Sequence, residues 1–248
     1  MNNNCTPIDV TIDFLADTPQ GKDPDKVNAT LRKYHKLLWS KPLPSGAMFD
    51  LVDTKAGAYL YHHSQLGEFW LTSDCVAPSF RNNSRLSQLL EQIPEARDSF
   101  VSISYTIGGM MVFPGKKVGG KMTINGERGF KSQIKDRFDL TVECIRRHYL
   151  NEESPLSDVL GRYADFFRLF GDFRGYVEFF LLQDLVTDDF SAVKFFSPFD
   201  NFQSSPVPNS MDAYLDYRSR AISFIESRNN RIARIGILSG SFSPSRRG

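Results

Sequence analysis

The sequence predicts an α+β fold in which a mixed or antiparallel sheet in the N-terminal half packs against a mainly helical C-terminal half. Two aromatic-rich runs, at 58–64 and 68–74, are joined by Gln-Leu-Gly and are typical of a β-hairpin. In the later part of the chain, apolar residues recur every three or four positions, which indicates amphipathic helices. Strands mixed with helices therefore come first and a helical half follows, without the regular alternation of a parallel α/β fold.

The N-terminal half carries short segments separated by Gly and Pro. Alternating apolar and polar residues predict a strand near the N-terminus, and the densest apolar run surrounds Gly108-Gly109, where we expect a tight turn or a close backbone approach. The expected elements are a strand at 8–16, a helix at 25–40, a hairpin at 58–74, a helix within 81–98 that stops near Pro94, strand structure at 99–115, and a glycine-rich loop with one short strand at 116–129.

The C-terminal half is predicted to be helical. Ile134, Phe138, Val142, Ile145 and Tyr149 form one apolar stripe. Ser154 and Pro155 are suited to the start of a further helix, and Gly171 to its end. The expected elements are helices at 132–149, 153–171, 176–186 and 210–230, a Pro/Ser loop at 197–210 and a disordered tail at 241–248. Because no linker composition marks a boundary, we expect one globular domain over 1–240.

Composition limits the class of protein. Hydrophobic residues make up 41% of the chain and include 21 Phe, which is enough for a large aromatic core. The sequence has no apolar run long enough to cross a membrane and no secretory signal, and its three cysteines are widely spaced. These features predict a cytoplasmic protein without disulfides. Four His and no paired Cys predict no metal site, and the sequence indicates no particular cofactor.

Charge is unevenly distributed although the net charge is only +1. Residues 116–149 hold nine Lys or Arg against four acids, and residues 150–190 hold nine acids against three Arg. From 211 to the C-terminus there are seven Arg against three acids. This pattern indicates either a basic site beside an acidic face or regions that neutralise one another in the folded chain.

The basic, glycine-rich lead-in to the helix expected at 132–149 is a candidate anion site. A helix N-terminus offers free N–H groups and a positive dipole end, and guanidinium groups bind phosphate well. The run lacks both the P-loop and the dinucleotide-binding glycine patterns, and it also suits a simple basic hairpin tip. The candidate phosphate-binding residues are Arg128, Arg137, Arg146, Arg147, Lys121 and, from the C-terminal helix, Arg228.

Carboxylates on the same helix are candidates for acid–base catalysis. Asp139 and Glu143 are four residues apart, as are Glu143 and Arg147, so these side chains are neighbours. Asp139 and Glu143 either have separated pKa values, as an acid–base pair needs, or form ordinary surface ion pairs. Glu143 and Asp136 are the catalytic candidates from this segment. His62, in the expected hairpin, is the third catalytic candidate. His62 and His63 point to opposite strand faces, so at most one enters a given cleft.

Arg228 lies within the apolar stripe of the last predicted helix. A guanidinium on the core side of a helix must be paired or must open onto a cleft. Asp184 and Glu178, which lie in or beside the buried segment 176–186, are the expected partners. The alternatives are an internal ion pair that joins two helices and an arginine that lines a pocket.

Several sequence phrases resemble an uncharacterised bacterial family that is defined only as a domain of unknown function. The phrases include LWSKPLPSG, YTIGGMMVFPG, INGERGF, IKDRFDLTVECIRRHY, DFFRLFGDFRGYVEFFLLQDLV and FIESRNNRI, and they extend over roughly residues 38 to 232. The resemblance implies one globular unit over about residues 5–238. It implies no activity, because no activity is established for the family.

Three classes of function fit these observations. The first is an enzyme or effector, of the toxin or phage-defence type, that acts on a nucleotide or nucleic acid through an Arg/carboxylate phosphate site. Single-stranded nucleic acid at Lys116, Lys117 and nearby aromatic residues is a variant of it. The second is a non-catalytic protein-interaction module, and the third is an enzyme on a small non-nucleotide substrate. The first class predicts that Arg128, Arg137 and Glu143 meet in one cleft. No membrane partner is expected, and the oligomeric state stays open.

Overall fold

A three-stranded antiparallel sheet with strand order β1–β2–β3 forms the centre of the fold. The computed structural model describes residues 8–240 except 79, 81–85, 87 and 89. Strands β1 (Leu60–Ser64) and β2 (Gly67–Cys75) form the hairpin expected from the sequence, and β3 (Met110–Pro114) pairs with the far half of β2. All five residues of β3 are buried although it is an edge strand of this sheet, because other elements cover it.

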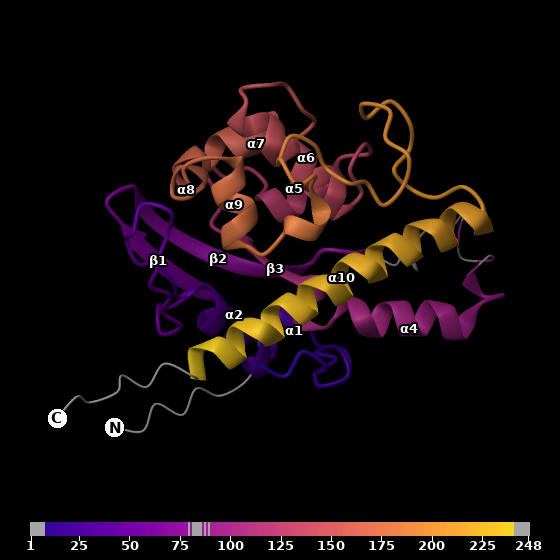
Figure 1. Cartoon of the computed structure of the whole chain (residues 1–248), viewed down its shortest axis with the longest axis horizontal. Coiled ribbons are helices and arrows are strands. Elements are labelled where there is room, and N and C mark those ends of the chain that lie inside the picture. The colour runs from indigo at the N-terminus through magenta and orange to yellow at the C-terminus, as the bar shows by residue number, and fades with distance from the viewer. Residues whose placement is uncertain (1–7, 79, 81–85, 87, 89, 241–248) are drawn as a thin grey trace.

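Helices surround the sheet (Figure 1). Those of the N-terminal half include α1, α2 and α4, and those of the C-terminal half run from α5 to α10. Their bounds are α1 Pro24–Val27, α2 Ala29–Trp39, α4 Pro94–Ser104, η1 Ile107–Gly109, α5 Ile124–Phe130, α6 Phe138–Tyr149, α7 Ser157–Arg162, α8 Ala164–Arg168, α9 Phe173–Phe179, η2 Gln183–Leu185 and α10 Met211–Gly240.

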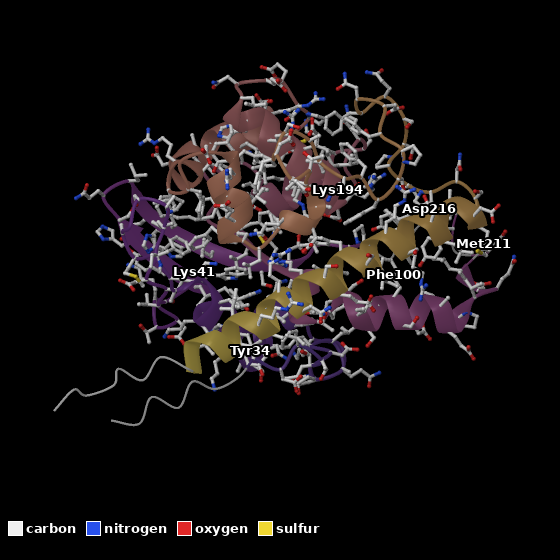
Figure 2. The ribbon with its side chains drawn as sticks, viewed as in Figure 1. Tyr34, Lys41, Phe100, Lys194, Met211 and Asp216 are labelled. Atoms are coloured by element: carbon white, nitrogen blue, oxygen red, sulfur yellow. The ribbon has the colours of Figure 1, made fainter. Side chains whose placement is uncertain are left out.

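The long helix α10 runs diagonally across the molecule beside α4, while α5 to α9 gather on the other side of the sheet (Figure 1). Phe100 of α4 lies between α4 and α10 (Figure 2), with its ring 6.4 Å from that of Tyr214 and 5.9 Å from that of Tyr217. The close contact of α10 with η1 explains the glycine pair. A Cβ on Gly108 would lie 2.6 Å from the carbonyl oxygen of Ile225, so only glycine fits.

Phenylalanine rings join the sheet to the helical half, as the α+β prediction requires. Phe69 of β2 lies 5.8 Å from Phe166 of α8, measured between ring centroids. Phe170 is surrounded by Tyr176, Phe179 and Phe180 at 5.0 to 5.4 Å. Edge-to-face and tilted pairs at these distances add to the burial energy of each ring.

The strand expected at 8–16 is replaced by turns. Asp9 Oδ1 accepts a hydrogen bond from the Thr11 backbone N–H, and Asp13 Oδ1 accepts from the Leu15 and Ala16 N–H groups. These side-chain bonds take up donors that a strand would need for its ladder. The alternating pattern was therefore a wrong guide to this segment.

Two other expected strand regions contain helix. Residues 94–104 form α4, because Pro94 occupies the first helical turn, where its missing N–H costs nothing. The residues Ile124–Phe130, expected as loop and strand, form α5, and the Thr123 side chain caps this helix by accepting from the Gly126 N–H. The helix expected before Pro94, and the tail at 241–248, lie largely or wholly outside the described residues.

Three predicted helices are shorter or interrupted. The helix expected at 132–149 starts only at Phe138, since Lys135 and Asp136 have left-handed φ angles of 45° and 62°. The helix expected at 153–171 is divided between α7 and α8. Gly171 ends the segment as predicted, and its φ angle is 77°. The helix expected at 176–186 is divided between α9 and η2. Four residues of the predicted stripe, Ile134, Phe138, Val142 and Ile145, are fully buried, whereas Tyr149 is partly buried and Ile134 precedes the helix.

Candidate functional site

Arg128 of α5 is completely buried and uses its guanidinium to join three elements. Nη1 donates to Asp74 Oδ2 of β2 at 2.6 Å, Nε to the Thr141 hydroxyl of α6 at 2.9 Å, and Nη2 to the Asp136 carbonyl at 2.8 Å. These bonds occupy the three nitrogens of the guanidinium. A ligand would therefore have to displace a protein partner to bind this arginine.

Asp136 and Lys121 lie on either side of this arginine in the sequence but have different surroundings. The carboxylate of Asp136 packs against Gly129, where a Cβ would come within 3.2 Å of both carboxylate oxygens. Its backbone N–H donates to the Arg128 carbonyl at 3.1 Å. Lys121 is exposed and, among the described residues, has no carboxylate within ion-pair distance.

Arg137 precedes the first residue of α6 and is almost fully buried. It forms a two-bond ion pair with Asp139, and Nη1 donates to the Pro206 carbonyl at 3.1 Å. Asp139 also accepts from the Phe196 N–H at 2.8 Å. This network fixes the 196–206 loop to the start of α6. Arg137 also contributes to a groove of about 720 Å³ beside that loop.

Glu143 is only 4% exposed and accepts bonds from two arginines. Arg146 donates through Nε to Oε2 at 2.8 Å and through Nη2 to Oε1 at 2.9 Å, and Arg147 donates through Nε to Oε1 at 2.8 Å. Arg147 also donates to Asn201 Oδ1 at 2.6 Å. The three side chains therefore form one ion-pair network along α6, with both oxygens of Glu143 in use.

His62 is a core residue of β1, and His63 on the opposite face is exposed, as strand alternation predicts. The Nδ1 of His62 bonds with the Asp50 carbonyl at 2.9 Å, and the His62 ring lies 4.3 Å from that of Phe49. Burial lowers the pKa of His62, so the ring is neutral at physiological pH. Its Nε2 is buried and has no hydrogen-bond partner among the described residues.

Arg228 is fully buried in the predicted core stripe of α10, but the expected carboxylate partner was wrong. Its guanidinium donates to the carbonyls of Phe180, Gly108 and Met110 at 2.8 to 3.2 Å. Asp184 pairs instead with Arg231, and Glu178 with Arg174. Carbonyls at the ends of η1 and α9 are free to accept because helix ends leave such groups without intrahelical partners. Burial lowers the pKa of Arg228 to about 10, and it stays charged.

The structure thus distributes the residues expected in one phosphate site among separate networks. Arg128 bonds with Asp74 and Thr141, Arg137 with Asp139, and Glu143 with two arginines of its own helix. The guanidinium groups of these arginines hold elements of the fold together. Convergence of Arg128, Arg137 and Glu143 in one cleft is not observed.

A different cleft, of about 510 Å³, opens beside β2 and is lined by residues from α1, α2, the 57–59 turn, β2 and the turn after β3. Helix α1 packs on β2 and supplies Asp25. This single turn of helix is fixed by Pro24 in its first turn and by Asp23, whose carboxylate accepts from the Asp25 N–H at 3.1 Å. The local sequence Asp-Pro-Asp therefore places a carboxylate at the cleft.

Asp25 occupies a partly buried position with too few hydrogen-bond donors. Its Oδ1 and the Oγ of the neighbouring Ser73, which is 97% buried, form no well-aligned hydrogen bond, although the Ser73 hydroxyl is close enough to lower the pKa of Asp25 against the effect of burial. Asn125, which donates to the Ser73 carbonyl at 3.5 Å, has a similarly unpartnered Oδ1. Burial raises the pKa of Asp25 to about 6, the range useful for proton transfer near neutral pH. Burial also raises the pKa of nearby Asp74, against the influence of Arg128.

A tyrosine and a histidine extend this cluster inward. The Tyr59 hydroxyl and His35 Nδ1 share a hydrogen bond of 3.1 Å, and Tyr59 also lies beside Ser73. Burial, with a contribution from Arg228, lowers the pKa of His35 to about 3, so its imidazole is neutral. Burial raises the pKa of Tyr59 far above its ordinary value, so its hydroxyl stays protonated.

Cations surround the opening of the cleft. Lys26, Arg32 and Lys116 line it together with the indole of Trp70. The Arg32 guanidinium lies 5.1 Å from the Tyr59 ring centroid, and Lys116 Nζ lies 3.8 Å from that of Trp70. The arrangement combines positive charge for an anion, an aromatic wall and a carboxyl group able to exchange a proton.

Sequence reasoning missed this cleft. Asp25 was interpreted only as the first residue of a helix expected after a Gly/Pro break, although the Asp-Pro-Asp helix start was a usable signal for a carboxylate at a fixed position. Its partners Tyr59, Ser73 and Lys116 are 34 to 91 residues away along the chain, and no local pattern joins them. Only the packing of α1 on β2 brings them together.

The fold and the cleft define an α+β protein with a cation-lined pocket over a protonatable carboxyl group. The chain belongs to the family of unknown function DUF6994, whose match covers residues 8–232. No curated protein and no solved structure matches the chain. Among the described residues, no helix is both long and apolar enough to cross a membrane, and no group of three or more His, Cys, Asp or Glu side chains is placed to hold a metal ion.

Proposed function

We propose that this protein is an enzyme that binds a nucleotide in the cleft beside β2 and uses Asp25 as its acid–base group. One observation carries the proposal: the Asp25 carboxyl, with its pKa raised to about 6, lies in a cleft lined by Lys26, Arg32 and Lys116. Three cations at one opening favour a multiply charged anion such as a phosphate chain. The cleft volume of about 510 Å³ is in the usual range for small-molecule sites.

The aromatic wall supports a nucleotide over a simple phosphate. Trp70 lines the same cleft as the cations, and a nucleobase that takes the place of the Lys116 ammonium over the indole can stack there while its phosphates reach lysine and arginine. Arg32 and Lys116 already contact aromatic rings, which holds their charges at the opening. These positions support a nucleotide whose base and phosphates contact different parts of one wall.

Asp25 would donate or accept a proton at the reacting centre. A carboxyl group with a pKa of about 6 is substantially populated in both protonation states near neutral pH. Asp25 lines the cleft and its Oδ1 has no well-formed hydrogen bond, so it offers an acceptor to a substrate hydroxyl or amino group. Buried polar atoms without partners are uncommon in native proteins, and a bound ligand would satisfy them.

Ligand-induced thermal stabilisation tests the binding step. We expect ATP, GTP, NAD or a cyclic nucleotide to raise Tm by several degrees at saturating concentration, since a ligand that binds only the native state stabilises it. The double variant Arg32→Gln/Lys116→Gln should lose the shift, and the charge-matched double variant Lys22→Gln/Lys194→Gln should keep it. A shift with inorganic phosphate or sugar phosphates but with no nucleotide would contradict the nucleotide assignment and favour a different small anionic substrate.

Chromatography of the bound nucleotide after incubation tests the catalytic step. Wild-type protein should convert it, and Asp25→Asn should bind it with a similar Tm shift while converting it at least a hundredfold more slowly, because general acid–base catalysis commonly contributes about 10² to 10⁴. Equal conversion rates in the two proteins would show that Asp25 is not the acid–base group of the reaction.

A further inference from the structure

A lysine-rich surface continues from the cleft along the segment that leads into α5 and out of it. It comprises Lys116, Lys117, Lys121, Lys131 and Lys135, and all but Lys131 are exposed. Among the described residues, none of the five has a carboxylate within 4.0 Å. A group of unpaired lysines within twenty residues is a favourable site for a polyanion.

The segment that carries these lysines is bonded to Arg162 of α7 and to Tyr163 on its protein side. Its lysine side chains are therefore left to the solvent side. Arg162 donates to the Met122 carbonyl at 2.8 Å, and the Tyr163 hydroxyl donates to the Lys116 carbonyl at 2.8 Å. Glu127, the acidic residue of α5, lies 3.7 Å from Arg162 in an ion pair. The local acid is therefore already neutralised, and the positive charge of the lysine-rich surface is not cancelled.

An exposed aromatic ring lies within this surface. Phe130, at the end of α5, is 69% exposed, the highest value among the described large apolar residues that are exposed. Gly126 lies one turn earlier on the same side of α5, and a Cβ there would touch the Met122 side chain at 3.3 Å. Met122 is itself 38% exposed. Phe130 and Met122 are thus exposed in the same stretch of chain as the lysines and are open to stacking.

The lysine-rich surface and the cleft are continuous. Lys116 belongs to both, since it lines the cleft beside Trp70 and begins the segment. Helix α5 covers the next part of β2, where Asn125 bonds with Ser73 and Arg128 with Asp74. A ligand that leaves the cleft past Lys116 therefore meets Lys117 and Lys121 next along the chain.

We propose that this surface binds the phosphates of a single-stranded nucleic acid whose terminal nucleotide occupies the cleft. This proposal rests on the proposed function. It specifies that the substrate is the end of a single-stranded nucleic acid and not a free nucleotide. An unpaired base can stack on Phe130, whereas a duplex has its bases already stacked and is too wide for a cleft of about 510 Å³. Phosphates along the strand match the row of lysines in charge.

Fluorescence anisotropy with labelled dT12 and rU12 in a salt series tests the proposal. Each neutralised phosphate of a single strand contributes about −0.7 to the slope of log K against log salt, so five lysines give about −3.5. The affinity should fall about a hundredfold between 50 and 200 mM salt. Lys117→Gln/Lys121→Gln should reduce the slope by about 1.4, while the control Lys22→Gln/Lys194→Gln leaves it unchanged.

Phe130→Ala tests the stacking contact separately from charge. We expect about tenfold weaker oligonucleotide binding without a change in the salt slope, because stacking is worth roughly this much per base. Leu37→Ala, at another exposed apolar residue, is the matched control and should bind normally. Mononucleotide binding should be unaffected in Phe130→Ala and in Lys117→Gln/Lys121→Gln, because these residues are not among those that line the cleft.

Three results would overturn this inference. The first is an oligonucleotide that binds no more tightly than the mononucleotide, which leaves the proposed function intact. The second is equal affinity for a duplex of the same length. The third is tighter binding to phosphatidylserine vesicles than to oligonucleotides, weakened by the same variants, which would identify a membrane surface as the partner. Conversely, failure of every mononucleotide to stabilise the protein, with oligonucleotides still bound, would contradict the proposed function of the cleft.

Discussion

Arg128 of α5 and Asp74 of β2 form an ion pair, with 2.6 Å between Nη1 and Oδ2, that connects a short helix of the second half of the chain to the central sheet. The guanidinium is fully buried, and the carboxylate lies beside the cleft that contains Asp25. The pair therefore links the stability of the fold to the geometry of the candidate site.

Arg128→Met should destabilise the protein by about 3 to 5 kcal/mol, because it leaves the Asp74 charge and two other acceptors without their donor. Urea unfolding followed by circular dichroism measures this loss. Arg97→Met removes a surface pair with the adjacent Asp98 and should cost less than about 1 kcal/mol. Similar losses of unfolding free energy in the two variants would show that the buried pair contributes no more to stability than the surface pair.

Asp25→Asn should stabilise the protein at neutral pH while it removes the proposed acid–base group. Burial raises the pKa of Asp25 from 3.8 to about 6, so the native state binds more protons than the unfolded state between these values. Wild-type stability therefore falls as pH rises through this window. The difference between variant and wild type should grow by about 1 to 3 kcal/mol from pH 4 to pH 7, since one pKa unit corresponds to about 1.4 kcal/mol.

The check is the urea midpoint of both proteins across that pH range. A constant difference would mean that Asp25 has an ordinary pKa and is not poised for proton transfer near neutrality. Asp23→Asn provides a control on the same short helix, because Asn is an equally good N-cap and its amide oxygen can still accept from the Asp25 N–H, so its difference from wild type should not grow in this way.

Arg228→Met should cost more than about 3 kcal/mol, because three buried carbonyls lose their donor and each unsatisfied group costs about 1 to 3 kcal/mol. Arg231→Met, one turn further along α10, breaks a partly exposed pair with Asp184 and should cost less than about 1 kcal/mol. Thermal unfolding by calorimetry compares the two. If Arg228→Met were as stable as Arg231→Met, the guanidinium would not be what fixes α10 to η1.

Gly108→Ala should destabilise the contact between η1 and α10. Its Cβ would lie 2.6 Å from both the Ile225 carbonyl oxygen and Asn229 Oδ1, so the long helix must shift. We expect a loss of about 1 to 3 kcal/mol, as for overpacked cores. Gly161→Ala in α7 has nothing within 4 Å and should stabilise by about 0.5 to 1 kcal/mol. Chemical denaturation of both variants should therefore give changes of opposite sign.

Glu143→Gln separates a structural from a catalytic role for the carboxylate singled out in the sequence. Loss of its charge weakens bonds to Arg146 and Arg147 in a nearly buried network, so stability should fall by about 1 to 3 kcal/mol. Nucleotide conversion per folded molecule should stay at the wild-type level. A large loss of nucleotide conversion without a loss of stability would show that Glu143 takes part in catalysis.

Periodicity and turn chemistry succeeded wherever local forces decide the structure. The hairpin at β1 and β2, the core stripe from Ile134 to Ile145 and the stop at Gly171 were all predicted correctly. Errors occurred where a side chain competes with the backbone or where packing overrides propensity. Asp9 and Asp13 convert an alternating segment to turns, and contact with α10 stabilises α4 in a segment that was expected in part as a strand.

By itself the sequence determined an α+β protein with its sheet in the N-terminal half and a mainly helical C-terminal half, an aromatic core and a basic segment at 116–149. The tertiary structure decided which charged side chains are available to a ligand. A charged side chain is unavailable when a group distant in the chain packs against it and forms its ion pair or hydrogen bonds. Arg128, Arg137 and Arg228 are occupied by Asp74, Asp139 and backbone carbonyls. Asp25, unremarkable in the sequence, gains a raised pKa because α1 packs on β2 and removes water from its carboxyl group.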